Sequence, residues 1–260
     1  MSRWAAGVEY IGTAYGGWQA QTNVRSVQAE VESALSTIAN HPIRVVCAGR
    51  TDAGVHAYQQ VVHFECDAER SAYAWVLGVN SLMPKDVSLR WVHPVSSHFN
   101  ARYSATARHY RYVIHNHSAR SALLFQRAAH WPQMLNVEAM HRAAQALIGE
   151  HDFSAFRGSR CQSKTSTRFM RSIALFRHGD FVVMDICANA FLHHMVRNII
   201  GALADVGLGK QPESQIALVL AGRDRRKAGL NAPPEGLYFI GPEYPAEFGL
   251  PAPPKPWFPA

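Results

Sequence analysis

Residues 181–191 read FVVMDICANAF, and residues 192–206 continue as LHHMVRNIIGALADV. The first stretch is dense in β-branched and aromatic residues, which is typical of a buried strand. In the second, apolar residues recur at helical spacing and Gly207 follows, so we predict an amphipathic helix that ends there. The apolar positions are Leu192, Met195, Val196, Ile199, Leu203 and Val206.

The same alternation of strand and helix extends over the rest of the chain in two rounds of similar length. Ser26 is a candidate N-cap for a helix that runs to about residue 38, and Gly149 is a candidate stop for a helix over 136–148. We predict further helices over 72–82 and 213–222, and strands over 3–11, 43–48, 60–66, 87–95, 106–116, 168–177 and 236–240.

This order of elements predicts an α+β fold with two similar lobes, each a mostly antiparallel sheet with helices on one face. We expect the first lobe to cover residues 1–105 and the second to cover 106–245. Residues 246–260 contain five prolines, which exclude regular secondary structure, so we expect either an extended strap or a partly mobile segment there.

Length and composition favour a soluble protein of the cytoplasm. The chain has 260 residues, of which 48% are hydrophobic, enough for a substantial core without metal or disulfides. No window approaches the roughly 18 apolar residues that span a membrane, and the N-terminus lacks a signal-peptide core. The four cysteines form no C-x-x-C pair, and we interpret them as free thiols: Cys47, Cys66, Cys161 and Cys187.

The charge balance points to a polyanionic partner. The formal net charge is +7, and the stretch from Arg157 to Arg177 contains six Lys or Arg residues with no Asp or Glu. Grouped cations attract phosphates, so nucleic acid is the simplest partner, although a solvated basic loop would give the same pattern.

The loop at 49–57, GRTDAGVHA, carries the clearest chemical signal. It lies between two predicted strands, and T-D-A-G is by itself a turn signal in which the Asp only caps the turn. Arg50, however, stands two residues before Asp52 and could orient the carboxylate and keep it ionised. A fixed carboxylate at a loop tip is suited to attack or stabilise an electron-poor carbon.

This loop resembles the signature of the tRNA pseudouridine synthase A family, and ordered blocks along almost the whole chain resemble that family too. Residues 162–169 are less typical. The blocks are Tyr15-Gly16-Gly17-Trp18-Gln19, Phe99-Asn100-Ala101-Arg102, Ala105 to Tyr112, Gly149 to Phe156, Asn189 to Asn198 and Gly236-Leu237-Tyr238.

The resemblance implies an RRM-like pseudouridine synthase fold with the active-site cleft between the lobes. It implies an isomerase that converts uridine to pseudouridine at positions 38–40 of the tRNA anticodon stem-loop. The base is flipped out, the N1–C1′ bond breaks and C5 bonds to C1′. This reaction has no redox step, so we expect no cofactor and no metal, and the family implies a homodimer.

The resemblance also assigns roles to individual residues. Asp52 becomes the catalytic carboxylate at C1′, and Tyr110 becomes the active-site tyrosine that stacks on uracil and helps to remove the C5 proton. By the same resemblance, Leu237 is expected near the uracil. Helical spacing puts Arg197 one turn from His193 or His194, and we expect it near the catalytic loop, contacting Asp52 or a phosphate. We expect RNA contacts from Arg25, Arg102, Arg108, Arg160, Lys164, Arg168 and His193.

His193 and His194 are adjacent in a predicted helix, so we expect them to point to different faces, which disfavours a zinc site. Two alternatives to the main hypothesis are a pseudouridine synthase for another RNA and an RNA-binding protein without catalysis. The second would leave Arg50 and Asp52 unexplained.

Overall fold

A computed structural model describes residues 2–159 and 161–256. The chain divides into two compact units. Unit 1 contains the residues up to Thr106 together with Tyr238–Pro256, and unit 2 is Ala107–Leu237. Within the described residues, no helix is both long and apolar enough to cross a membrane.

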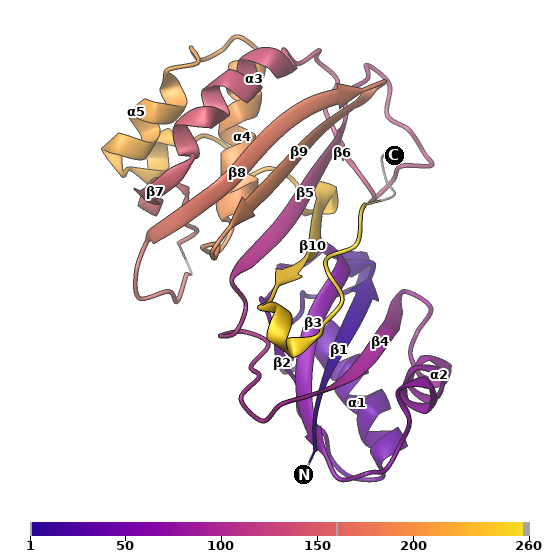
Figure 1. Cartoon of the computed structure of the whole chain (residues 1–260). Helices are drawn as coiled ribbons and strands as arrows, with labels where there is room; N and C mark the ends of the chain where they lie inside the picture. The colour runs from indigo at the N-terminus through magenta and orange to yellow at the C-terminus, as the bar shows by residue number, and fades with distance from the viewer. Residues whose placement is uncertain (1, 160, 257–260) are drawn as a thin grey trace. The chain divides into compact units, whose positions relative to one another are not determined.

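Unit 1 is built on a sheet in the order β4-β1-β3-β10, with β2 also paired to β3 (Figure 1). The strands are β1 (Ser2–Tyr10), β2 (Val46–Cys47), β3 (His56–Cys66), β4 (Val87–Val95) and β10 (Leu237–Glu243). β1 runs antiparallel to both β3 and β4, whereas β10 runs parallel to β3 with Tyr238 opposite His56.

Two neighbouring helices, α1 (Val27–Ala39) and α2 (Ala72–Leu82), complete unit 1. Ser26 caps α1 by accepting a hydrogen bond from the Ala29 N–H, as predicted, and Asn40 ends the helix in the left-handed conformation. Ser71 caps α2 in the same way. The buried faces of the helices cover the sheet, with Trp75 and Leu35 fully enclosed.

The proline-rich segment after β10 belongs to the core of unit 1. Phe248 and Leu250 pack against a buried cluster that includes Phe99 and Val61. Gln59 donates weak hydrogen bonds of 3.4 Å to the carbonyls of Pro251 and Ala252. Apart from a short 3₁₀ turn at Ala246–Phe248, which the prolines were expected to exclude, the segment up to Pro256 lies as an extended strap on unit 1. Residues 257–260 lie outside the described part.

The two units differ from the expected lobes 1–105 and 106–245 at the C-terminal end. The strand expected at 236–240 is β10, and its pairing with β3 places Tyr238–Pro256 in unit 1. The second boundary therefore moves from 245 to Leu237. A parallel partner more than 170 residues away carries no local sequence signal.

Unit 2 has a sheet in the order β5-β9-β8-β7, with the short β6 parallel to β5. Its neighbouring pairs β5–β9, β9–β8 and β8–β7 are antiparallel. The expected α+β fold, with mostly antiparallel strands and helices, is confirmed. The strands are β5 (Ala107–His115), β6 (Ala129–His130), β7 (Gly149–Asp152), β8 (Thr167–His178) and β9 (Phe181–Ala188).

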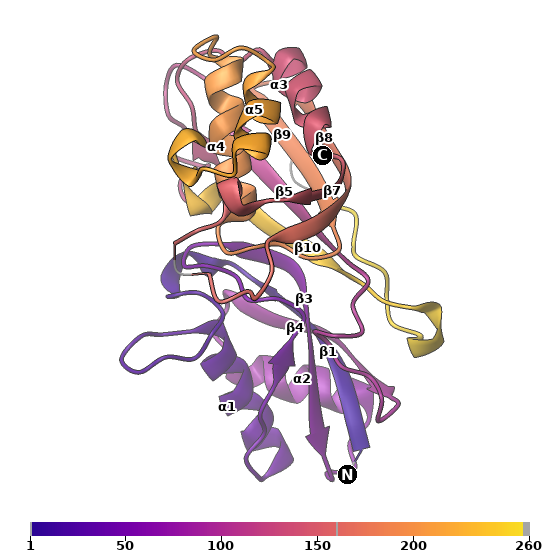
Figure 2. The same cartoon turned by 90° about the vertical axis from the view of Figure 1, so that its left-hand side faces the viewer.

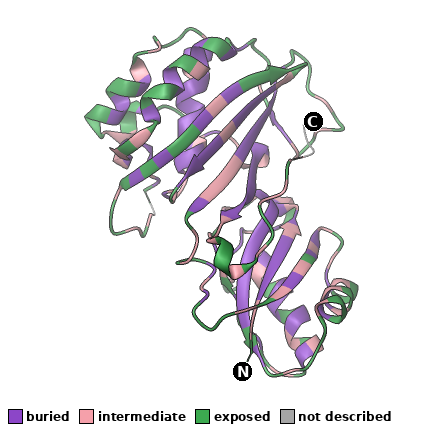
Figure 3. Cartoon of the chain, in the orientation of Figure 1, coloured by how far each residue is buried: buried purple, intermediate pink, exposed green. Residues whose placement is uncertain are grey.

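Three helices cover one face of this sheet (Figure 2). They are α3 (Val137–Ala144), α4 (Met195–Gly207) and α5 (Gln215–Gly222). Side chains on β8 alternate between exposed and buried along much of the strand, since one face packs under the helices and the other does not (Figure 3). β9, in the middle of the sheet, is buried almost throughout.

Two predicted helices of unit 2 differ from the expected bounds by three residues or more at one end. The helix predicted over 136–148 ends at Ala144 and continues as a 3₁₀ turn, and Gly149, with φ +103°, opens β7. The helix predicted over 192–206 begins only at Met195, because His194 has φ +61° and interrupts the helical backbone.

His63 in β3 gives unit 1 a predictable response to pH. Its Nδ1 accepts a hydrogen bond from the Ala101 N–H at 3.1 Å, which requires a neutral ring. Burial, and secondarily the nearby Arg3, lowers the pKa of His63 to about 4. Stability from a depressed histidine pKa is complete above the unfolded value of about 6.5 and is lost as the pH falls towards the folded value.

We therefore expect the free energy of unfolding to drop by about 2 kcal/mol between pH 7.5 and 5 because of His63 alone. Urea unfolding of the wild type and of His63→Gln at both pH values measures this, with the exposed His178→Gln as control. If His63→Gln and the wild type lose equal stability on acidification, His63 does not carry the effect.

Candidate active site

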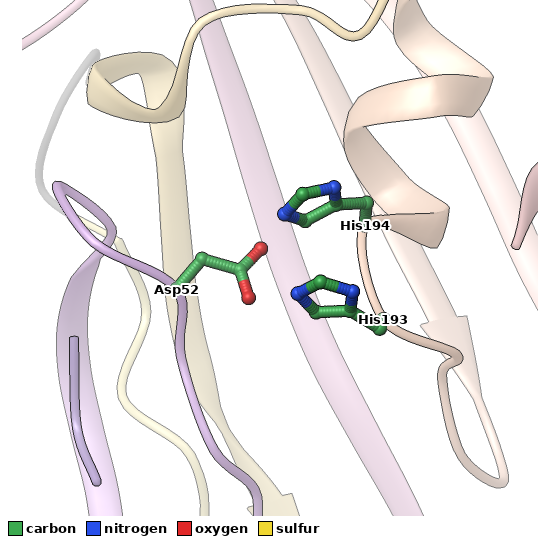
Figure 4. Close-up of side chains that lie close together, drawn as sticks. All are labelled: Asp52, His193 and His194. Carbon is green, nitrogen blue, oxygen red and sulfur yellow. The ribbon is translucent and has the colours of Figure 1, made fainter. Parts of the chain in front are cut away.

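The loop that contains Asp52 connects β2 to β3 in unit 1. Figure 4 shows the Asp52 side chain on this loop. Its start is anchored by the Ala48 N–H, which donates to the Val61 carbonyl at 2.8 Å. The buried Gln60 side chain then bonds both the N–H and the carbonyl of Gly49. The base of the loop is thus tied to β3 before the chain reaches Asp52.

Asp52 opens a tight turn. The Val55 N–H donates to the Asp52 carbonyl at 3.2 Å, and Gly54 has φ +81° at the third position of the turn, which favours glycine. The T-D-A-G turn signal is confirmed. Arg50 is exposed on the same loop, two residues before Asp52. Its proposed orientation of the carboxylate stays a prediction.

Tyr110 lies on β5 of unit 2. Its ring meets that of Phe191 edge to face, with centroids 5.0 Å apart and planes at 79°. Two residues earlier on the same strand, Arg108 donates from an Nη atom to the Asn189 carbonyl at 2.9 Å. Both residues therefore contact the segment between β9 and α4. Phe191 was not singled out in the sequence, where it is only one apolar residue in a strand pattern.

Leu237 is the first residue of β10 and is 5% exposed. Gly236 before it lies so close to the Val113 carbonyl that an added Cβ would sit 2.7 Å from that oxygen. The backbone at this point is therefore closely packed, and only a residue without a side chain fits before Leu237.

His193 and His194 precede α4, and their rings stack with centroids 3.8 Å apart and planes at 28° (Figure 4). The expectation that they point to different faces is wrong, because the left-handed backbone at His194 turns its ring onto that of His193. Nδ1 of His194 lies 2.9 Å from the side-chain nitrogen of Asn231. The His193 carbonyl accepts from the Gly158 N–H at 2.8 Å.

Arg197 lies in the first turn of α4. Its Nε donates to the Ala232 carbonyl at 2.7 Å, and the Ala232 N–H donates back to the Arg197 carbonyl at 3.1 Å. This pair fixes the stem of the side chain beside the loop that leads to β10. The predicted contact of Arg197 with Asp52 or a phosphate stays a prediction.

Two of the predicted RNA-binding arginines lie in unit 1. Arg25 forms an ion pair with Glu30 at 2.7 Å and stacks over the Tyr15 ring at 4.6 Å. The hydrogen bond that Arg25 donates to Glu30 is the main reason why the pKa of Arg25 is raised. Arg102 is exposed, with its guanidinium 5.6 Å from the Tyr103 ring.

The basic loop before β8 belongs to unit 2. Lys164 is exposed, but Arg168 is 9% exposed and holds its own loop together. Its guanidinium donates to Ser163 Oγ at 2.6 Å, Thr165 Oγ1 at 3.2 Å and the Thr167 carbonyl at 2.6 Å. Arg168 therefore has a structural role whether or not it contacts RNA. Arg160 lies outside the described residues.

The four cysteines are free thiols: Cys66 and Cys187 are buried, and Cys47 and Cys161 are half-buried. Burial raises the pKa of Cys47 to about 11, so this thiol stays protonated. Within either unit taken alone, the described residues bring no three potential metal-ligand atoms together.

The family model for tRNA pseudouridine synthase matches residues 6–104 and 143–245 of this chain. The chain belongs to the tRNA pseudouridine synthase family. The matched segments contain the Asp52 loop, His193, Arg197 and Leu237, whereas Arg108 and Tyr110 fall between them. The family resemblance inferred from GRTDAGVHA and the other blocks is thereby confirmed.

Relatives of the synthase with the name tRNA pseudouridine synthase A are similar over nearly their whole length. Those of Cronobacter sakazakii and Salmonella arizonae are 56% identical over 250 residues, and that of Escherichia fergusonii is 55% identical over 250 residues. Each alignment covers 96% of this chain and 93% of the relative. The protein is thus an isomerase that converts uridine to pseudouridine in tRNA.

Proposed function

We propose that this synthase modifies uridines 38–40 of the tRNA anticodon arm and that Asp52 is its catalytic carboxylate. The observation that carries the proposal is the Asp52 loop, a sharp turn anchored on β3 that presents one carboxylate in the family's signature sequence. The support for positions 38–40 is the resemblance of the whole set of sequence blocks to the A family. A synthase of another tRNA position is the alternative.

Asp52 is proposed to act at C1′ of the target nucleotide. As the N1–C1′ bond breaks, C1′ becomes electron-poor, as it does in glycoside hydrolysis. A carboxylate can add to C1′, or it can stabilise the sugar while the 2′ proton leaves. A glycosidase needs a second carboxylate to activate water, but an isomerase keeps its base and must exclude water, so one carboxylate suffices.

Tyr110 is proposed to stack on the flipped uracil and to assist removal of the C5 proton after C5 has bonded to C1′. The edge-to-face contact with Phe191 at 5.0 Å fixes the orientation of the ring, and the hydroxyl is proposed to be the reactive group. Leu237, on a closely packed backbone, is proposed to pack against the uracil. His193, Arg197 and Arg50 are proposed to support the site or the RNA.

Phosphate contacts are proposed to offset the cost of flipping a stacked base, which is a few kcal/mol. The candidates are Arg25, Arg102, Arg108, Arg160, Lys164 and Arg168. Because Arg168 holds the preceding loop together, weaker tRNA binding by an Arg168 variant would not demonstrate a direct contact between Arg168 and RNA. Lys164 is the better probe, since its side chain is exposed and no shift of the loop is expected when it is removed.

We expect Lys164→Ala to weaken tRNA binding about 3- to 10-fold at low salt and to reduce the slope of log affinity against log salt by about 0.7–0.9. Filter binding across a salt series measures both quantities. Lys210→Ala is the control, because Lys210 is exposed and pairs with Asp205 at 4.0 Å. An unchanged slope in Lys164→Ala would remove Lys164 from the RNA interface.

The synthase is further proposed to act as a homodimer in the cytoplasm, as the family resemblance implies. Sedimentation at working concentrations tests the dimer, and a monomer would contradict it. Transcripts of one tRNA in which uridines 38, 39 and 40 are replaced singly by cytidine test the position. Release of tritium from C5-labelled uridine should fall only when the modified uridine is replaced, and unchanged release from all three would favour another position.

A further inference from the structure

The peptide that precedes Asp52 is held by residues from a different part of unit 1. The Trp18 N–H donates to the Thr51 carbonyl at 3.0 Å. The hydroxyls of Thr51 and Tyr10 lie 2.7 Å apart and share a hydrogen bond. Tyr10 is 2% and Thr51 7% exposed, so the bond is shielded from water. The carbonyl and the hydroxyl of Thr51 are therefore both hydrogen-bonded next to Asp52.

Gly17 closes the same side of the loop. Its φ is +101°, and a Cβ added there would lie 2.7 Å from the Thr51 carbonyl oxygen and 3.1 Å from the Asp52 carbonyl carbon. The backbone of Gly17 thus packs directly on the peptide that links Thr51 to Asp52. Any side chain at position 17 would have to push this peptide away.

The end of the turn at Val55 also packs closely against the segment that contains Gly12. A Cβ on Gly12 would lie 1.9 Å from the Val55 carbonyl oxygen, and the Gly12 N–H donates to Nδ1 of His56 at 3.1 Å. The Tyr10 and Trp18 rings lie 5.9 Å apart, and Trp18 is 1% exposed. Residues 10–18 therefore form a rigid seat beneath the turn that runs from Thr51 to Val55.

We propose that Tyr10, Gly17 and Thr51 are positioning residues that fix the Asp52 carboxylate in its reactive orientation. This inference rests on the proposed catalytic role of Asp52. Asp52 follows Thr51 directly, so a shift of the Thr51 peptide moves the carboxylate by a similar amount. A misplacement of about 1 Å at a reacting group can cost about 100-fold in rate. tRNA binding depends on phosphate contacts elsewhere and should change little.

The sharpest test compares two substitutions of Thr51. Thr51→Val keeps the shape but loses the hydroxyl, and Thr51→Ser keeps the hydroxyl. We expect Thr51→Val and Tyr10→Phe to lower kcat about 10- to 100-fold with KM for tRNA within about 3-fold, and Thr51→Ser to stay near wild type. Tyr244→Phe is the matched control in unit 1. It also removes a tyrosine hydroxyl that donates a partly buried hydrogen bond, here to the Ala101 carbonyl at 2.6 Å.

Gly17→Ala tests the seat itself. We expect it to lower kcat at least as much as Thr51→Val does. Gly179→Ala separates strain from contact, because Gly179 also has a positive φ, +54°, but a Cβ there would meet nothing within 4 Å. Gly179→Ala should therefore lose some thermal stability and keep its kcat.

All assays are run well below the Tm of each variant and corrected for folded enzyme, with Asp52→Asn in parallel. A merely structural role would lower Tm and leave kcat unchanged, and this result would overturn the inference. Equal losses of kcat in Thr51→Ser and Thr51→Val would also overturn it. If Asp52→Asn itself turns over normally, the proposed catalytic role fails instead. If Gly17→Ala does not fold, Tyr10→Phe and the Thr51 pair still decide, because Tyr10→Phe removes one oxygen, Thr51→Ser removes one methyl group and Thr51→Val exchanges a hydroxyl for a methyl group.

Discussion

Replacement of Asp52 by Asn is expected to abolish turnover while tRNA affinity stays within a few-fold of wild type. The amide has nearly the shape of the carboxylate but no charge, so it can neither add to C1′ nor stabilise positive charge there. The loss should be at least about 1000-fold, as for removal of a nucleophile or of a preorganised charge at a reacting centre. Affinity should persist because phosphate contacts supply most of it.

Tritium release from C5-labelled uridine in tRNA measures turnover, and filter binding measures affinity. Asp67→Asn is the control, because Asp67 is an exposed carboxylate of the same unit outside the loop. Turnover of Asp52→Asn within ten-fold of wild type would show that the carboxylate is not the catalytic group. A parallel collapse of affinity would show instead that Asp52 acts mainly in binding.

Tyr110→Phe is expected to keep tRNA bound but to slow product formation by about 100-fold. The ring and its contact with Phe191 remain, so stacking on the uracil should persist, whereas the hydroxyl that assists C5 proton removal is lost. Removal of the C5 proton should then limit the rate. With uridine deuterated at C5, a primary kinetic isotope effect should appear in the variant and exceed that of the wild type.

Tyr112→Phe is the matched control on the same strand. The Tyr112 hydroxyl donates to the Pro233 carbonyl at 2.7 Å in the core of unit 2. Its loss should cost about 1 kcal/mol of stability without an effect on turnover. If Tyr110→Phe and Tyr112→Phe have equal rates, or if no isotope effect appears, Tyr110 has no role in proton transfer.

The parts of the fold that could be predicted from the sequence are those with a local physical signature. The predictions for residues 72–82 and 87–95 agree with α2 and β4, because both segments have a local apolar pattern. Ser26 was recognised as an N-cap because it directly precedes an apolar pattern at helical spacing. In unit 2 the predicted strands at 106–116 and 168–177 match β5 and β8 to within one residue at each end.

The errors occur where distant contacts decide. β7 is a short polar strand, GEHD, that exists because it pairs with β8 at the edge of the sheet. β6 has two residues and no pattern of its own. His194 adopts a left-handed backbone that no helical periodicity reveals, so the helix was predicted to begin three residues too early and the histidine pair was placed on opposite faces.

In the candidate site, too, features with a local sequence signal were predicted and features set by distant contacts were not. Asp52 and its turn were recognised because T-D-A-G is a local signal and the family signature surrounds it. The seat made by Tyr10, Gly17 and Trp18 could not be recognised, since its contacts join residues more than 30 positions apart. Arg168 looked like any other cation of the basic stretch, and only its three hydrogen bonds show that it holds the preceding loop together.

The most direct test of the proposed function is nucleotide-resolution mapping of pseudouridine in one purified tRNA after treatment with the synthase and with Asp52→Asn. Wild type should form pseudouridine within positions 38–40 and nowhere else, and Asp52→Asn should form none at equal tRNA occupancy. Pseudouridine outside those positions would contradict the proposed specificity. Pseudouridine formed at the wild-type rate by Asp52→Asn would contradict the central claim that this carboxylate performs the reaction.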